Sequence, residues 1–262
     1  MSRFITLCSS SSGNAAFVGT GSYGVLIDAG VSAKRIKTAM TAAGLDPDFI
    51  KAIFITHEHD DHVKGLNVLA ASLKVPVYAT PGTMAGLADA NILDGRFPYE
   101  LLTDESVAVG DIRVSHFFTS HDSRQSCGYR IDLPDGAVGV ATDTGYATPE
   151  MMKALAGCDL VLLESNYDDD MLVNGYYPPY LKARIRSKVG HLSNDDSAAA
   201  ACTLLDLGVR RFVLGHLSQH NNTPALALAA HRAAFAAYGA KENKDFLLQA
   251  APVEAMEEYI IF

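Results

Sequence analysis

Several features that assign chains to special classes are missing here. There is no low-complexity tract, and no run approaches the 18 uninterrupted apolar residues of a membrane-spanning helix, so we expect no membrane span. The apolar run after Arg3 is too short for the core of a signal peptide. Four widely separated cysteines form no CxxC pair, which argues against a disulfide framework and favours a reducing compartment. We therefore expect a cytoplasmic protein.

Positive charge is also scarce. Lys and Arg number 21 against 30 Asp and Glu, giving a net charge of −9. Proteins contact nucleic-acid phosphates through Lys and Arg, so this balance favours a small-molecule enzyme. Bound divalent cations or one local basic stretch would make the charge positive at the substrate site, so a nucleic-acid substrate stays open. No linker-like tract divides the 262 residues, and we expect residues 1–262 to form one domain.

Short strands and hairpins alternate with helices in both halves of the chain. We expect hairpins over 107–118 and 128–142. Helices are expected over 32–43, with Ser32 as N-cap, and over 63–73, 149–156, 194–207 and 224–237. The other strands are expected at 4–7, 16–18, 25–28, 52–56, 77–79, 160–163 and 212–214. Hairpins and βα units in both halves predict an α/β fold, an αββα four-layer sandwich with two sheets face to face.

The segment ITHEHDDH, residues 55–62, crowds three histidines and three carboxylates behind an apolar strand. After a strand, residues i and i+2 point the same way, so His57 and His59 can hold one ion together. The chain then turns toward a helix, which aims Asp61 and His62 at a second ion. Imidazole and carboxylate suit zinc, manganese or iron. Two such ions would activate a water molecule and stabilise a phosphoryl or acyl transition state.

A site with two metals needs ligands from elsewhere in the chain. His121, Asp143 and His216 each follow an apolar strand, where the ligands of a sheet-based site converge. Taken singly, each also fits a core histidine or an aspartate that starts a turn. The spare acids Glu58 and Asp60 fit roles in orienting ligands or facing solvent, and Asp28 in LIDAG fits support of the metal loop through hydrogen bonds.

HEHDDH followed in order by His121, Asp143 and His216 resembles the metallo-β-lactamase superfamily. The resemblance implies an αββα sandwich with two divalent metal ions per chain between its sheets. His57, His59 and His121 would hold one ion, Asp61, His62 and His216 the other, and Asp143 would bridge them. Zinc or manganese is expected, and iron is compatible.

A closer resemblance, to the YycJ/WalJ type of this superfamily, covers residues 4–222. It is carried by CSSSSGN, VLIDAG, FITHEHDDHVKGL, ATDTGY, LLESNYDDDML, YYPPYLKARI, GHLSN and LGHLSQHNN. Members of this type are described as single-domain 5′-to-3′ DNA exonucleases. Two places depart from the pattern: His220 stands where an acid is expected, and SRQSCGY after His121 and Asp122 places Cys127 near the site.

The related ribonuclease Z branch pairs a GHS-type histidine with a glutamate, and the matching residues here are His191 and Glu164. A carboxylate would fix the imidazole so that it contacts a phosphate oxygen or donates a proton to the leaving oxygen. With Asp61, these two are the expected catalytic residues. Simpler readings remain, because Glu164 also fits an acid that starts a turn and His191 the neighbour of a helix N-cap.

Substrate contacts are expected from three places. Ser11, Ser12 and Asn14 lie in a loop able to hold a terminal phosphate, although turn formation explains this loop as well. Lys182, Arg184 and Arg186, with Lys188, form the largest basic concentration and fit either a phosphate grip or a solvated helix face. Asn221 in LSQHNN completes the set. Tyr176, Tyr177 and Tyr180 precede the basic stretch and fit either stacking on unpaired bases or packing under a loop.

These observations predict a metal-dependent phosphodiesterase acting on nucleic acid, with DNA favoured over RNA and a 5′-to-3′ exonuclease favoured in particular. An RNA-processing nuclease or a phosphodiesterase for cyclic nucleotides is the alternative on the same scaffold, and the acidic net charge favours small substrates. A metal-stabilised scaffold protein is a third class. The complete set of seven ligands argues against it, because a structural metal site needs no open coordination position.

Overall fold

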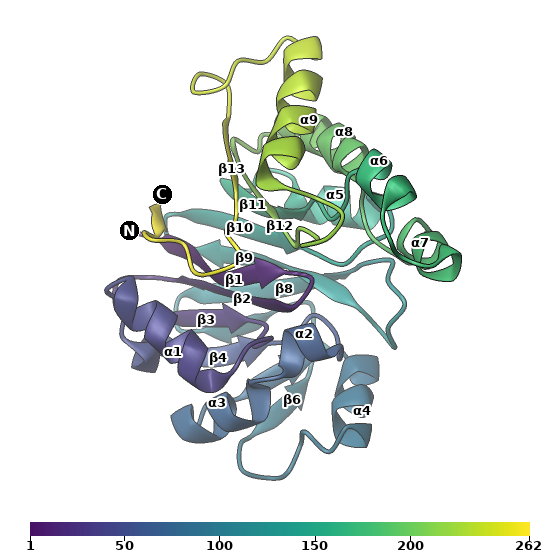
Figure 1. The fold of residues 1–262 in the computed structure, drawn as a ribbon. Helices are drawn as coiled ribbons and strands as arrows, with labels where there is room; N and C mark the ends of the chain where they lie inside the picture. Colours follow the sequence, from purple (N-terminus) through teal and green to yellow (C-terminus); the bar gives the residue numbers. More distant parts are fainter.

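Two seven-stranded sheets lie face to face at the centre of the protein, and helices cover both outer faces (Figure 1). The structure, a computed structural model, describes residues 1–262. The predicted αββα sandwich is confirmed. No helix is both long and apolar enough to cross a membrane. That the whole chain is one domain stays a prediction.

The first sheet combines an antiparallel part, formed by the strands from both chain ends, with a parallel part. β1 pairs antiparallel with β2 and with the C-terminal β14, so the two chain ends lie side by side (Figure 1). From β3 to β6 neighbouring strands are parallel. The order is β14 (Ile260–Ile261), β1 (Arg3–Ser10), β2 (Gly13–Gly19), β3 (Gly24–Ile27), β4 (Ile50–Phe54), β5 (Val77–Ala79) and β6 (Tyr99–Leu101).

The second sheet has the same mixed character. Strands β7 to β10 form antiparallel pairs, and β10 to β13 are parallel. Its order is β13 (Leu247–Ala250), β12 (Arg211–Gly215), β11 (Leu160–Glu164), β10 (Gly136–Ala141), β9 (Cys127–Leu133), β8 (Ile112–Phe118) and β7 (Val107–Val109). Because β8, β10, β11 and β12 all run in one direction, their carboxyl ends meet at one edge.

The helices begin at side-chain caps. Ser32, as predicted, and Thr80 accept hydrogen bonds from the first turns of their helices. The first half contains α1 (Ala33–Ala42), a short 3₁₀ turn η1 (Pro47–Phe49), α2 (Asp60–Val63), α3 (Leu66–Leu73) and α4 (Pro81–Asp89). The second half contains α5 (Pro149–Leu155), α6 (Asp169–Asn174), α7 (Pro179–Ile185), α8 (Asn194–Asp206) and α9 (Pro224–Ala237).

Three apolar clusters separate the four layers. The central cluster joins the facing sides of the two sheets, for example Phe54 with Tyr129, whose rings meet edge to face at 5.6 Å. A second cluster packs the first sheet against α1 and α3, and a third packs the second sheet against α5, α8 and α9. The two sheets are therefore fixed against each other, which holds their strand ends in register.

One predicted helix is interrupted. The segment expected as a single helix over 63–73 contains the last residue of α2 and all of α3, with a break at Lys64 and Gly65. Gly65 donates its N–H to the Ala29 carbonyl, and a Cβ there would lie 2.0 Å from the Val31 carbonyl oxygen. The helix is broken where this neighbouring turn approaches, so the expectation of one continuous helix was wrong. The periodicity of the apolar residues could not reveal this close approach.

Candidate metal centre

The expected site residues meet where strands from both sheets end. Residues 57–62 follow β4 in the first sheet. From the second sheet, His121 follows β8, Asp143 follows β10, Glu164 ends β11 and His216 follows β12. The structure thus brings together side chains that are up to 159 positions apart, from His57 to His216.

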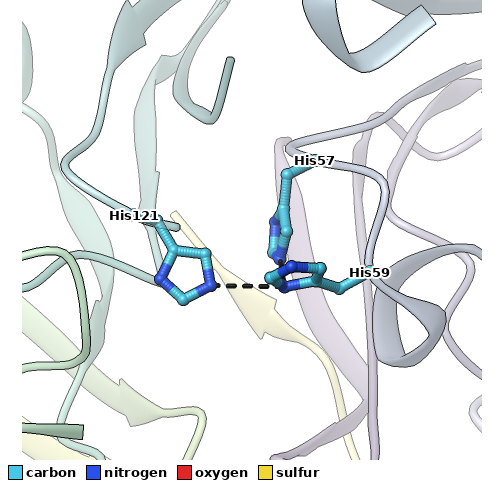
Figure 2. A group of neighbouring side chains, drawn as sticks. All are labelled: His57, His59 and His121. Atoms are coloured by element: carbon cyan, nitrogen blue, oxygen red, sulfur yellow. Dashed lines mark hydrogen bonds between the residues drawn. The ribbon is translucent and has the colours of Figure 1, made fainter. Parts of the chain in front are cut away.

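Three histidines form one half of the centre. His57 Nε2 lies 3.0 Å from His59 Nδ1, and His121 Nε2 lies 3.3 Å from the same nitrogen. Figure 2 shows the three rings directed at a common point from two sides. All three offer a nitrogen within 4.8 Å of the others, which is a spacing that one metal ion can span.

Asp61, His62 and His216 form the other half, and they also satisfy this spacing. Asp61 Oδ2 lies 3.5 Å from His62 Nε2 and 3.4 Å from His216 Nε2. His62 and His216 are buried, whereas Asp61 is partly exposed. Both triplets match the division into two ion sites that the superfamily resemblance implies. Their role as ligands stays a prediction.

Asp143 lies between the two halves. Its Oδ2 is 3.2 Å from His62 Nε2, and its Oδ1 is 3.7 Å from His121 Nε2. This buried Oδ2 has no well-aligned hydrogen-bond donor in the protein. A buried carboxylate oxygen without a donor is unfavourable unless a cation compensates its charge. With imidazoles on both sides, this carboxylate fits a bridging ligand for divalent ions.

Backbone conformation aims three side chains of the site. Asp28, Asp143 and His216 adopt left-handed φ angles of 61°, 58° and 55°. Such residues are uncommon and cost about 1–3 kcal/mol when strained. Each directly follows a strand or lies one residue beyond it, and the unusual turn points its side chain toward the centre. The surrounding hydrogen bonds hold this geometry.

The metal-facing atoms are oriented by a surrounding set of hydrogen bonds. Asp28 Oδ2 accepts from His62 Nδ1 at 2.7 Å, which leaves His62 Nε2 for the centre. Asp28 also accepts from the backbone N–H of Thr56 at 2.8 Å, so it supports the metal loop as expected. His121 Nδ1 donates to the Gly190 carbonyl at 3.0 Å and likewise leaves its Nε2 free.

Burial and neighbouring carboxylates shift the pKa values of the histidines in opposite directions. Burial lowers the pKa of His57 and of His121, which favours the neutral imidazole that metals bind. Burial also opposes charge on His62, but the carboxylates of Asp28, Asp143 and Asp61 outweigh it and raise its pKa well above the usual value. The carboxylates therefore favour positive charge here. Together with the donor set and the unpartnered Asp143 oxygen, this fits divalent cations.

Glu164 and His191 are joined as the resemblance implies. Glu164 is fully buried, and its Oε1 lies 2.8 Å from both His191 Nδ1 and His216 Nδ1. Its Oε2 accepts from the N–H of Thr144 at 2.8 Å. His191 is partly exposed, and its Nε2 forms no hydrogen bond within the protein. Glu164 thus orients one expected metal ligand and one expected catalytic imidazole with a single oxygen.

The basic stretch is largely paired within the protein. Lys182 Nζ donates to the carbonyls of Val173 and Gly175, at 2.7 Å each. Arg184 forms a two-pronged pair with Asp122, and Arg186 Nε lies 3.4 Å from Asp169 Oδ1. Among these three, Arg184 also lines the cavity over the metal centre. Their role as phosphate contacts stays a prediction.

Two adjoining cavities open at the centre. One of about 220 Å³ lies over the metal centre between Asp61, His191 and Arg184. The other, of about 590 Å³, lies beside α2 and α3 and is lined by Ser12, Lys64 and others. Ser11 and Asp61 line both, so a chain-like substrate can extend from one into the other.

Neither of the two asparagines expected to contact the substrate, Asn14 and Asn221, lines these cavities. Asn14 Nδ2 lies 3.2 Å from His62 Nε2, and the Asn221 carbonyl accepts from the Asp168 N–H.

Sequence reasoning missed several supporting residues. Asn166 donates to the His216 carbonyl at 2.8 Å, and Ser9 Oγ accepts from the His216 N–H at 2.9 Å. Lys64 lines the larger cavity and forms no ion pair. Asn166 lies inside the ESNYD motif, which is the one signal that points to it. Cys127 is buried, with its Sγ 3.6 Å from the Thr56 carbonyl, so it packs behind the metal loop.

Known proteins are similar to this chain in sequence or in architecture. A family model described as a beta-lactamase superfamily domain matches residues 23–217. The exodeoxyribonuclease YycJ of Bacillus anthracis is 37% identical over 229 residues, with 86% of each chain covered. The exodeoxyribonuclease WalJ of Streptococcus pneumoniae serotype 2 (strain D39 / NCTC 7466) is 35% identical over 228 residues, covering 86% of this chain and 85% of its own.

Among solved structures, the metallo-β-lactamase fold protein YhfI from Bacillus subtilis superposes with a TM-score of 0.75 at 15% identity. The match covers 97% of this chain and 98% of that one. At this identity it supports the fold alone.

Proposed function

The chain belongs to the metallo-β-lactamase superfamily as a YycJ-like metal-dependent hydrolase, and from this premise we propose that it is a 5′-to-3′ DNA exonuclease with two metal ions. The observation that carries the proposal is the pair of ligand triplets on either side of the buried Asp143 oxygen. The similarity to two exodeoxyribonucleases over most of the chain supports DNA as the substrate.

Seven side chains would hold the ions. One triplet is His57, His59 and His121, the other is Asp61, His62 and His216, and Asp143 would serve both. Divalent zinc or manganese suits these nitrogen and oxygen donors. Such ions supply Lewis-acid polarisation of a phosphodiester and lower the pKa of a coordinated water.

His191 is proposed to assist the departure of the leaving oxygen. Glu164 Oε1 accepts the hydrogen of His191 Nδ1, which fixes the ring and leaves Nε2 as the atom that meets the substrate. His191 lines the cavity over the metal centre, beside Arg184 and Asp61. From this position Nε2 can hydrogen-bond a phosphate oxygen or deliver a proton to the leaving oxygen. Glu164 does not touch the substrate and acts through the imidazole.

The two adjoining cavities support action at a strand end. The larger one has room for a single nucleotide, and Lys64 with Ser11 and Ser12 supplies donors for its 5′-phosphate. The remainder of the strand would leave through the cavity over the metal centre, which α7 borders. A terminal phosphate held at the Ser11 and Ser12 turn sets the scissile bond one nucleotide from the 5′ end, which is the arrangement that a 5′-to-3′ exonuclease requires.

A degradation assay with end-labelled DNA tests the proposal. With Mn²⁺ or Zn²⁺, single- and double-stranded oligomers should release mononucleotides from the 5′ end, faster when that end is phosphorylated. Asp61→Ala should abolish release, whereas Asp104→Ala, at an exposed acid outside the site, should not change it. Release beginning at the 3′ end would reject the polarity, and hydrolysis of RNA alone would reject the substrate. Full activity of Asp61→Ala would reject the metal mechanism.

A further inference from the structure

Three aromatic rings cluster beside the cavity over the metal centre. The ring centroids of Tyr176 and Tyr177 are 5.0 Å apart, and His220 lies 5.5 Å from the first and 5.9 Å from the second. All three pairs meet edge to face, at interplanar angles of 69° to 83°. Tyr176 is 75% exposed, and His220 is exposed as well. We call these three residues the aromatic trio.

The aromatic trio continues the wall of the site. Tyr177 lines the same cavity as Asp61, Asp143 and His191. Tyr177 also packs on a small core of Tyr167, Leu172 and Ile185. A strand that leaves the cavity on the Tyr177 side would pass these rings.

The segments that carry the trio are held firmly. Lys182 bonds the carbonyls of Val173 and Gly175 just before the two tyrosines. A Cβ on Gly175 would lie 2.7 Å from the Met171 carbonyl oxygen, so the chain has no room there. The Asp168 N–H bonds the Asn221 carbonyl next to His220 at 2.8 Å, which ties the two segments together. A surface that is already ordered loses less entropy when it binds.

The basic stretch offers little free positive charge to a nucleic acid. The protein carries a net charge of −9, and Lys182, Arg184 and Arg186 are already paired. Stacking of a base on an aromatic ring is worth about 1–3 kcal/mol and depends little on sequence. It requires a free base face, which a base inside a duplex does not offer.

On this basis, and resting on the proposed nuclease function, we propose that the aromatic trio binds an unpaired base of the substrate strand. The trio would make the enzyme select single-stranded DNA or the unpaired end of a duplex. His220 departs from the family pattern. Its ring packs edge to face against both tyrosines, so we assign it the role of a specificity residue. Tyr176 presents the most exposed ring and is the principal stacking surface.

Binding of a hydrolysis-resistant phosphorothioate oligothymidylate to the Mn²⁺-loaded protein tests this inference. Tyr176→Ala should weaken binding about tenfold, as the loss of one stacking contact implies. Tyr176→Phe should bind as the wild type does, because the ring is kept. His220→Ala should weaken binding and His220→Phe should restore it. Tyr99→Ala, at a half-exposed tyrosine on the far edge strand β6, is the matched control and should change nothing.

Two further readouts separate stacking from charge and from catalysis. The slope of log Kd against log salt concentration should be the same in wild type and Tyr176→Ala, because no ion pair with phosphate is lost. Binding of a blunt duplex should not respond to the substitution. If the wild type degrades DNA but Tyr176→Ala binds the oligomer equally well, the inference falls while the proposed function stands. If the loaded wild type cleaves no DNA, the proposed function itself fails.

Discussion

At the scale of the residue, Glu164 connects two of the expected roles in the site. Its Oε1 contacts both His191 and His216, so one carboxylate orients an expected proton donor and an expected metal ligand. Glu164→Gln keeps the shape but gives each imidazole a neutral partner. We expect kcat to fall about 10²-fold or more, since general acid–base assistance is worth about 10²–10⁴. Metal affinity should fall about 10- to 100-fold.

Steady-state kinetics and a metal titration measure these two effects. Glu105→Gln, at an exposed glutamate outside the site, serves as control and should leave both unchanged. A kcat for Glu164→Gln within a few-fold of the wild type would show that the shared oxygen has no catalytic role.

His231 makes stability depend on pH away from the metal ligands. It is fully buried in α9, with Nε2 3.1 Å from Ser197 Oγ, and burial lowers its pKa to about 4. Below pH 6.5 the unfolded chain takes up a proton here that the folded chain does not bind until about pH 4. The free energy of unfolding therefore falls with acidification across this window. From pH 7 to 4.5 the loss is about 2–3 kcal/mol.

His231→Asn removes this titration. Urea unfolding of metal-free protein at pH 7 and 4.5 should show a smaller acid loss for His231→Asn than for the wild type, by about 2 kcal/mol. The difference isolates His231 because both proteins keep the other histidines. Equal acid losses in the two proteins would contradict this account of the residue.

At the scale of the element, the turn after β3 packs between the loop that carries Asp61 and the strand that carries Asn14. A Cβ on Gly30 would lie 1.7 Å from the Asp61 carbonyl oxygen and 2.6 Å from the Asn14 nitrogen. Gly30→Ala must push the metal loop away, so we expect a loss of about 1–3 kcal/mol in the free energy of unfolding and weaker metal binding.

Urea unfolding and a metal titration check this prediction. At Gly21 a Cβ would meet only the Arg3 guanidinium, at 3.5 Å, so Gly21→Ala should behave like the wild type. Unchanged metal affinity in Gly30→Ala would mean that the metal loop does not depend on this turn.

The sequence predicts the alternation of strands and helices and the positions of the expected ligands, because both depend on local patterns. His57, His59 and Asp61 follow a strand at fixed spacing, and parallel strands place the others at one edge. The αββα layers were predicted correctly for the same reason. The break between α2 and α3 could not be predicted, since it comes from Gly65 meeting a turn distant in sequence.

Some helices lack a strong sequence signal. α4 contains two glycines and carries little amphipathic pattern, and α7 is short. The sequence likewise does not reveal which groups pair with the basic side chains. Arg184 meets Asp122 from 62 positions away, and only the folded chain reveals that this charge is already paired. The local run of basic residues therefore indicated a phosphate grip more strongly than the structure does.

At the scale of the whole molecule, the expected metal ligands are divided between the two sheets. His57, His59, Asp61 and His62 come from the first sheet, and His121, Asp143 and His216 come from the second. Ions held by both groups would join the two halves. A ligand that binds only the folded state stabilises it by about 2.7 kcal/mol at 100 times its Kd, so chelation should lower the Tm.

Titration of metal-free protein with Zn²⁺ or Mn²⁺, with heat of binding and ion content measured together, tests the central claim most directly. The account predicts two ions per chain in the wild type and fewer than two in Asp143→Ala. A wild type that binds one ion or none at saturation, or an Asp143→Ala variant that still binds two ions with unchanged affinity, would contradict it.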